Sequence, residues 1–93
     1  MTVVGYPKIY NLTLTNANQE YSQALDNEVR YFEVKCRTLN DMKMAFVSGE
    51  SGVTYLTIPA GSMWFTRALV NADLTLYLQS PDAGVVAEIM QWT

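Results

Sequence analysis

Apolar and polar residues alternate along most of this chain, and this period of two is the strongest constraint on its fold. From Lys8 to Thr15, for example, Tyr10, Leu12 and Leu14 alternate with asparagine and threonine. Successive side chains of a β-strand point to opposite faces, so a segment of this kind predicts a half-buried strand. Threonine, valine, tyrosine and phenylalanine dominate these segments, and their preference for a pleated surface disfavours a helix.

Clusters of glycine, proline, asparagine and aspartate separate the alternating segments and predict turns. Strands are expected within the following segments: Lys8–Thr15, Glu28–Thr38, Met42–Val47, Val53–Ile58, Ser62–Thr66, Leu74–Gln79 and Val85–Trp92. Tyr21–Leu25 is either a short edge strand or an irregular crossing, and Ala68–Val70 is long enough for one helical turn at most. Ser48–Gly52 predicts a hairpin loop, because its two glycines supply the positive φ that tight connections require.

Short strands spaced about ten residues apart, with no convincing helix among them, predict an all-β fold. We expect an antiparallel β-sandwich or barrel of the jelly-roll or Greek-key type, with about seven or eight strands. No linker or change in composition divides the sequence, so residues 1–93 are expected to form a single β-sandwich domain. The last predicted strand reaches Trp92, which predicts a C-terminus held within a sheet.

The composition indicates more apolar surface than one small core absorbs. Apolar residues make up 49% of the 93 residues and charged residues only 16%, against about 25% charged in ordinary soluble domains. A chain this short also buries a smaller fraction of its surface than a larger protein does. Self-association is the ordinary way to bury such a surplus, because obligate oligomer interfaces resemble a core cut in half. The composition therefore favours a homo-oligomer.

Several partner classes are disfavoured by charge and hydropathy. The net charge is −3 and the basic residues are scattered singly, whereas nucleic-acid binding requires clustered positive charge. The apolar runs are only a few residues long, far short of the ~20 that a membrane-spanning helix requires. Met1–Tyr6 lacks the basic start and apolar run of a secretory signal, so a cytoplasmic start is expected. We expect neither nucleic acid nor membrane as a partner.

No group of residues in the sequence has the pattern of a catalytic, cofactor-binding or metal site. Histidine is absent, which removes the commonest general base and the commonest metal ligand. The aspartates lie mostly at predicted turns and the glutamates are dispersed. Glu88 lies among apolar residues and either pairs with Arg30 or Arg67, or points to solvent or a subunit boundary. The lone Cys36 reads as a small buried hydrophobe rather than a reactive thiol. We expect no enzyme activity and no cofactor.

Aromatic residues and methionine provide the candidate functional surface. Met63, Trp64 and Phe65 are consecutive, so both faces of their predicted strand are apolar, and it is either buried on two sides or faces a partner. Tyrosine, tryptophan, phenylalanine and methionine are enriched at protein interfaces. The candidate oligomer interface is Met63, Trp64, Phe65, Tyr31, Tyr77 and Trp92. The alternative is a carbohydrate- or receptor-binding module, in which Trp64 or Trp92 lies exposed in a shallow concave face.

The whole sequence resembles the small β-sandwich structural proteins of tailed bacteriophages that are encoded beside head genes. The segments that carry this resemblance are Tyr21–Leu25, Ser48–Gly52, Ile58–Ser62 and Gly84–Trp92. The resemblance implies a non-enzymatic homo-oligomeric virion component, either a capsid decoration or a head-associated protein. It further implies a capsid or other virion protein as a second partner and a location in the virion after synthesis in the host cytoplasm; otherwise the protein is expected to be cytoplasmic. No functional residue is carried over from the resemblance.

Overall fold

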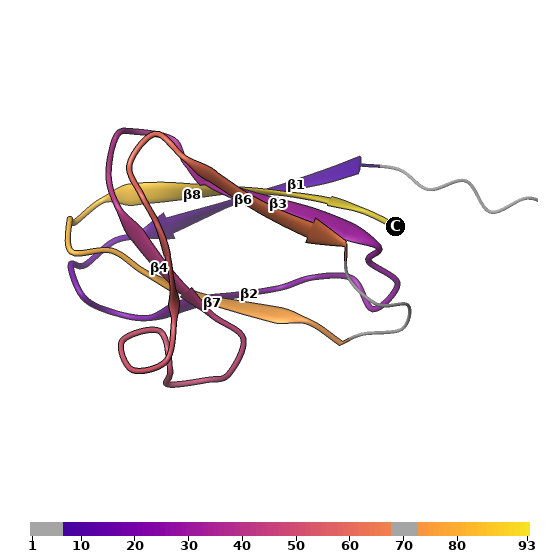
Figure 1. The fold of residues 1–93 in the computed structure, drawn as a ribbon, viewed down its shortest axis with the longest axis horizontal. Coiled ribbons are helices and arrows are strands. Elements are labelled where there is room, and N and C mark those ends of the chain that lie inside the picture. Colours follow the sequence, from indigo (N-terminus) through magenta and orange to yellow (C-terminus); the bar gives the residue numbers. More distant parts are fainter. Residues whose placement is uncertain (1–6, 68–72) are drawn as a thin grey trace, which may run out of the picture.

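The structure is a computed structural model that describes residues 7–67 and 73–93. These residues form eight strands and no helix, which confirms the all-β prediction (Figure 1). The strands are β1 (Pro7–Leu14), β2 (Tyr21–Ala24), β3 (Tyr31–Cys36), β4 (Met42–Ala45), β5 (Leu56–Ile58), β6 (Met63–Arg67), β7 (Thr75–Gln79) and β8 (Val85–Trp92). The helical turn considered at Ala68–Val70 lies outside the described residues.

The strands pair in a nested order, the first with the last. β1 pairs with β8, β2 with β7, β3 with β6 and β4 with β5, all antiparallel. Further pairing of β8 with β3 and of β7 with β4 produces two four-stranded sheets, in the orders β1-β8-β3-β6 and β2-β7-β4-β5. This nesting across two layers is a jelly roll, so the sandwich prediction is confirmed and its topology is resolved.

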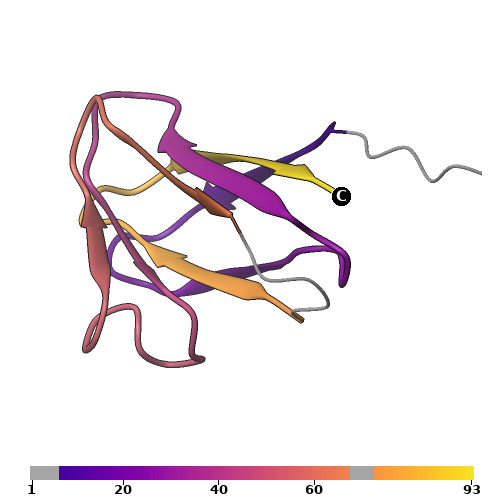
Figure 2. The ribbon, with the colours of Figure 1, turned by 45° about the vertical axis from the view of Figure 1, so that its right-hand side comes forward.

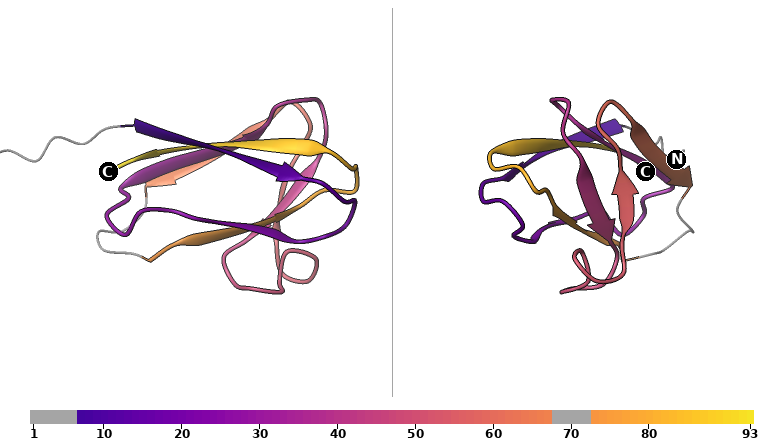
Figure 3. Two further views of the ribbon diagram at one scale, coloured as in Figure 1. Left: turned by 180° about the vertical axis from the view of Figure 1, so that it is seen from behind. Right: turned by 60° about the vertical axis from the view of Figure 1, so that its left-hand side comes forward.

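The two sheets form the layers of the sandwich. Figure 2 shows β1, β8, β3 and β6 in one layer above β2 and β7, with the β4–β5 hairpin closing one side. The left view of Figure 3 shows the same layers from behind, and the right view shows β4 beside β5. The chain ends in β8, between β1 and β3, so the predicted anchoring of the C-terminus in a sheet is confirmed.

The core lies between the sheets and follows the alternation of the sequence. One sheet contributes Leu14, Phe32, Val34, Val85, Ala87 and Ile89, and the other contributes Met42, Met44, Ile58, Leu76 and Leu78. Full burial of one large apolar side chain stabilises a fold by about 1.5–3 kcal/mol. The residues between them in each strand point outward, which fixes the side chains available on each outer surface.

The connection between β4 and β5 differs most from the sequence prediction. The expected strand Val53–Ile58 begins only at Leu56, because the backbone N–H groups of Val53 and Thr54 both donate to the Glu50 carbonyl oxygen. Only one of the two glycines expected at positive φ adopts it, Gly49 at φ 83°. Gly52 is required for close approach instead, since a Cβ there would lie 3.3 Å from the Gln79 amide oxygen.

This connection is fixed to the sheet below it and is not a free hairpin tip. The carboxylate of Glu20 accepts hydrogen bonds from the backbone N–H of Gly49 at 2.8 Å and of Ser51 at 3.0 Å. The Ser51 hydroxyl donates to the Gln79 side-chain oxygen at 2.9 Å, and Ser51 is buried. Residues far apart in the sequence thus hold the loop against β7.

Candidate functional site

Exposed large apolar side chains gather on two surfaces, one of which surrounds the β4–β5 connection. The other is the side of the sheet β1-β8-β3-β6 turned away from the core, hereafter the outer face. It points upward in Figure 1, because the other sheet lies beneath. Phe32 and Val34 of β3 point inward, so Tyr31, Glu33 and Lys35 point outward, and the other strands alternate in the same way. The exposed fractions of its large apolar residues are 67% for Ile9, 58% for Phe65, 46% for Met63 and 41% for Trp92.

Strand register places the residues of the outer face in three rows across the sheet. The first row is Pro7, Trp92, Tyr31 and Arg67; the second is Ile9, Met90, Glu33 and Phe65; the third is Asn11, Glu88, Lys35 and Met63. Directly opposite side chains on one face lie about 5 Å apart, so each row is a line of neighbours. The exposed apolar residues therefore lie on β1, on β6 and at the end of β8, and the charged residues Glu33, Lys35 and Glu88 lie between them on the two central strands.

The candidate residues Met63, Phe65, Tyr31 and Trp92 come together on this outer face, and Tyr31 and Phe65 are in ring contact with centroids 6.2 Å apart. This contact restricts both side chains before any partner binds. A shallow groove of about 190 Å³ lies beside them, lined by Ile9, Glu33, Lys35, Glu88, Ile89 and Met90.

The other two candidate residues lie elsewhere. Trp64 belongs to the inward side of β6, half-buried, with its ring centroid 5.5 Å from that of Phe32 and 6.0 Å from that of Phe46. Tyr77 belongs to β7 in the opposite sheet, where it pairs with Ala45 and Ser22. β6 is therefore not buried on two sides: its inner side packs in the sandwich and its outer side is exposed.

Glu88, Lys35 and Glu33 of the outer face each have a partner within the chain. Glu88 contacts Lys35 at 3.5 Å and Arg37 at 3.1 Å, so neither Arg30 nor Arg67 is the partner considered from the sequence. The hydrogen bond from Arg37, followed by the charges of Lys35 and Arg37, lowers the pKa of Glu88 against the opposing effect of burial. The Tyr31 hydroxyl donates to Glu33 at 2.9 Å, and this bond raises the pKa of Tyr31. The charges of Glu88 and Lys35 are thus compensated within the chain, whereas Glu33 keeps its negative charge because its partner is a neutral hydroxyl.

A second concave surface lies between β4, β5 and their connection. This groove has a volume of about 410 Å³ and is lined by Met44, Ala45, Phe46, Val47, Glu50, Thr54, Tyr55 and Leu56. Within the described part of the chain, the Glu50 Oε2 atom is buried with no hydrogen-bond partner. Lys43 lies over the Tyr55 ring, 4.8 Å from its centroid. The groove is mostly apolar, and its only ionisable lining groups are Glu50 and Tyr55.

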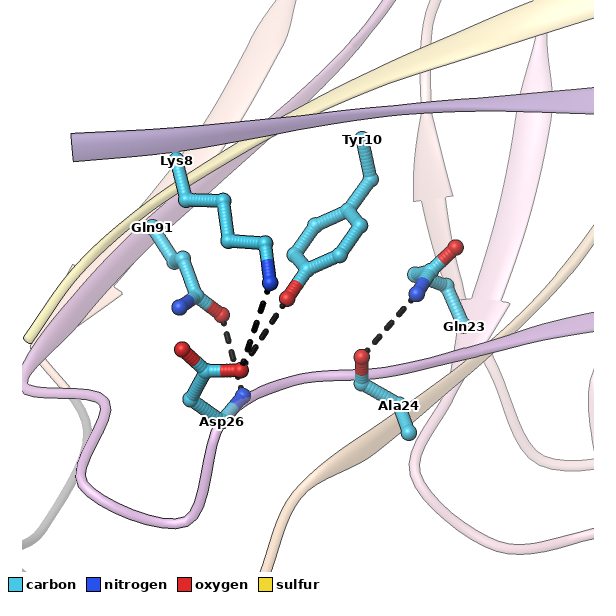
Figure 4. Close-up of polar contacts among 6 residues, drawn as sticks. All are labelled: Lys8, Tyr10, Gln23, Ala24, Asp26 and Gln91. Atoms are coloured by element: carbon cyan, nitrogen blue, oxygen red, sulfur yellow. Dashed lines mark hydrogen bonds and ion pairs between the residues drawn. The ribbon is translucent and has the colours of Figure 1, made fainter.

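A polar cluster joins the β2–β3 connection to the first sheet (Figure 4). Asp26 accepts a hydrogen bond from the Tyr10 hydroxyl at 3.2 Å, and the Lys8 ammonium lies 3.8 Å from the same oxygen. The backbone N–H of Asp26 donates to the side-chain oxygen of the buried Gln91 at 3.0 Å. The cluster contains no nucleophile paired with a base, so its arrangement is that of a structural tie between a loop and two strands.

Residues 7–67 and 73–93 contain no group of three or more histidine, cysteine, aspartate or glutamate side chains placed to hold a metal ion. In the same residues there is no helix long and apolar enough to cross a membrane. Cys36 is half-buried, with its Sγ atom 3.7 Å from the Thr38 hydroxyl oxygen.

Sequence reasoning missed Ile9 and Met90, which lie side by side on the outer face. Ile9 is out of phase with Tyr10, Leu12 and Leu14, and this phase was the available signal that it points away from the core. Its position beside Met90 required the pairing of β1 with β8, which alternation alone does not specify.

No protein-family model, no curated protein and no solved structure matches this chain. A functional assignment therefore depends on the geometry of the two surfaces described above.

Proposed function

We propose that this protein is a non-enzymatic structural module that associates with copies of itself through the outer face. The observation that carries the proposal is the gathering of Ile9, Met63, Phe65 and Trp92 on one face, each with more than two fifths of its surface exposed. Contiguous exposed apolar surfaces rimmed by polar groups mark interaction sites. Aromatic residues and methionine are the types enriched in interface centres.

A second copy of the chain is the partner that the charges of this face favour. Glu88 is paired with Lys35 and Arg37, and Glu33 accepts from Tyr31. A strongly basic partner would gain little from Glu88, and an acidic one little from Lys35, because these charges are already paired, and either partner would desolvate its own charges. A second copy of the chain presents the same apolar residues and the same paired charges, so it avoids this desolvation cost.

The jelly-roll fold is compatible with a virion component, because viral capsid and lectin domains are among its known uses. Fold alone does not assign function, so this step rests on the sequence resemblance to small structural proteins of tailed bacteriophages. We propose a capsid decoration or head-associated protein, made in the host cytoplasm and located in the virion. Its partners are then further copies of itself and a capsid or other virion protein.

The native mass of the purified chain across a dilution series, measured by light scattering, tests self-association. We expect a mass that is a multiple of the 10.5 kDa chain. Phe65→Glu places a charge among the exposed apolar residues of the outer face and should reduce the mass to that of one chain. Val53→Glu is the matched control, because Val53 is also apolar and exposed, at 73% against 58% for Phe65, but lies in the β4–β5 connection. A single-chain mass for the unaltered protein at all concentrations would contradict the proposal.

Carbohydrate binding is the second candidate, and one observation favours it. Trp92 lies directly opposite Tyr31 on the outer face, with Arg67 next in the row, so two aromatic rings and a polar group are adjacent. Aromatic faces of this kind stack on sugar rings. If the unaltered chain is monomeric, saturable quenching of tryptophan fluorescence by a sugar, lost in Trp92→Ala, would favour this function instead.

A further inference from the structure

We propose that two copies pack their outer faces together about a twofold axis that runs parallel to the strands, between β8 and β3. This inference rests on the self-association proposed above and specifies its geometry. Two identical faces meet through a twofold axis lying in the plane between them, which makes every contact occur twice. An axis parallel to the strands reverses the strand order of the partner. β1 then lies over the partner's β6, and β8 lies over the partner's β3.

The second row begins and ends with an apolar residue, and this operation places each of the two against the other end of the partner's row. Ile9 and Phe65 are the first and last residues of the row that also contains Met90 and Glu33. Reversal of the strand order places Ile9 against the partner's Phe65, and Phe65 against the partner's Ile9. These are the two most exposed of the large apolar residues on the outer face. The shallow groove lined by Ile9 and Met90 lies on the side that the partner's Phe65 approaches.

The two inner residues of the first row, and those of the third row, also match under the same operation. In the first row Trp92 and Tyr31 are neighbours, so Trp92 meets the partner's Tyr31. In the third row Glu88 and Lys35 are neighbours, so each carboxylate of Glu88 meets the partner's Lys35 ammonium. Pairs of opposite charge across an interface fix the register of association.

An axis perpendicular to the strands is disfavoured by the same residues. Along the second row it would place every residue against its own copy, so that Glu33 faces the partner's Glu33. Like charges brought together across an interface cost several kcal/mol. It would also place Trp92 near the partner's Glu88 and leave its ring without an aromatic neighbour. The charges of the face therefore select the parallel axis.

Sheet packing allows this arrangement. Face-to-face sheets pack about 10 Å apart with strands crossing at about 30°. Rows lie about 7 Å apart along a strand, and the edge strands lie about 7 Å from the axis. A crossing of this size therefore shifts facing residues by a few ångströms, both in the flanking rows and at the ends of the central row.

Thiol crosslinking between mixed variants with a short bismaleimide tests the axis. In a Cys36→Ala background, which removes the only cysteine, one sample carries Ile9→Cys and another carries Phe65→Cys. Facing sheets lie about 10 Å apart, beyond the Cα separation of about 7 Å that a disulfide allows, so a short crosslinker is needed to join the two thiols. In the proposed dimer, the two copies of position 9 are displaced from each other sideways by a further three strand spacings, about 14 Å. We expect the mixture to form a covalent dimer with the crosslinker, while each variant alone remains uncrosslinked. Asn11→Cys mixed with Met63→Cys is a second pair, with the same expectation.

The possible results separate this inference from the proposed function. Efficient crosslinking of Ile9→Cys alone would overturn the parallel axis and indicate a perpendicular one. An oligomeric mass without crosslinks in either mixture would also overturn the geometry, while leaving self-association intact. A monomeric mass of the unaltered chain would overturn both. Light scattering on each cysteine variant shows whether the substitution has itself prevented association, and the other pair then provides the test.

Discussion

The carboxylate of Glu20 holds the β4–β5 connection in place by accepting the backbone N–H groups of Gly49 and Ser51. Contact with the Ser51 hydroxyl, together with these two N–H groups, keeps the pKa of Glu20 below its ordinary value of 4.5, against the raising effect of burial. A carboxyl whose pKa falls on folding stabilises the fold above its ordinary pKa. This contribution is lost as the pH falls through the lower, folded-state pKa.

Glu20→Gln tests this role through the pH dependence of thermal unfolding. A glutamine side chain has one acceptor oxygen and no charge, so it accepts only one of the two N–H groups fully. We expect Tm at neutral pH to fall by about 4 °C, from the loss of about 1 kcal/mol. The difference from the unaltered chain should shrink below pH 4.5, where Glu20 itself becomes protonated. Circular dichroism melts at several values between about pH 7 and 3 measure both effects.

Glu50→Gln is the matched control, since Glu50 lies in the same loop. Its Oε2 atom is buried with no hydrogen-bond partner in the described part of the chain. Replacing this carboxylate removes a buried charge and breaks no bond to that atom, so Tm should stay the same or rise. A Glu20→Gln variant with the Tm of the unaltered chain at neutral pH, or with a difference that does not change with pH, would disprove the anchoring role.

Contacts of single residues were the least predictable part of this structure. The sequence predicted a loop at Ser48–Gly52 but not its anchoring, because the Glu20 contact to Ser51 spans 31 residues. Glu88 was expected to pair with Arg30 or Arg67, or to point to solvent or a subunit boundary, whereas its partners are Lys35 of β3 and Arg37 just after it. Both errors have one cause: alternation assigns a face to a residue but does not say which strand lies beside it.

The two sides of β6 lie in different environments, one packed and one exposed. Trp64 packs against Phe32 and Phe46 inside the sandwich, while Met63 and Phe65 on either side of it are exposed. The sequence predicted a strand with two apolar sides and left open whether it was doubly buried or faced a partner. The sheet order resolves this, because β6 is an edge strand with one side on the core.

Trp64→Ala should lower mainly the stability of the fold, whereas Phe65→Ala should weaken mainly self-association. Trp64→Ala opens a cavity beside Phe32 and should lower the free energy of unfolding by about 2–3 kcal/mol, less than for a fully buried tryptophan. Phe65→Ala removes an exposed side chain and should change the unfolding free energy of the isolated chain by less than about 0.5 kcal/mol, while weakening self-association. Urea unfolding at low concentration and light scattering at high concentration separate the two. Equal destabilisation by both would argue against this division of β6.

The strand bounds followed from the sequence where alternation was long and uninterrupted. Val85–Trp92 matches β8 fully, and Tyr21–Leu25 contains the short edge strand β2. The predicted strand Val53–Ile58 is longer than β5, because the backbone N–H groups of Val53 and Thr54 donate to the Glu50 carbonyl oxygen in a turn. Alternation reports the side-chain pattern, whereas a strand also requires free backbone groups for a neighbour.

At the scale of the whole molecule, the order of the strands brought the outer face together. Ile9 and Phe65 are far apart in the sequence and come into one row because β1 pairs with β8, β8 with β3, and β3 with β6. The composition predicted surplus apolar surface but gave it no location, since sandwich topologies share the same alternation. The nested pairing places part of that surplus on the outer face, while another part, which includes Val47, Val53 and Leu56, lies around the β4–β5 connection.

If this face is buried by a second copy, thermal stability must depend on protein concentration, because association stabilises only the folded chain. Each tenfold rise in concentration adds about 1.4 kcal/mol per dimer, or about 0.7 kcal/mol per chain, which raises Tm by about 3–6 °C in a domain of this size. Phe65→Glu should abolish this dependence, whereas Val53→Glu should retain it. Melts over a hundredfold range of concentration provide the measurement. A Tm that stays constant for the unaltered chain over this range would mean that folding and association are not coupled, and that the outer face is exposed in the folded state.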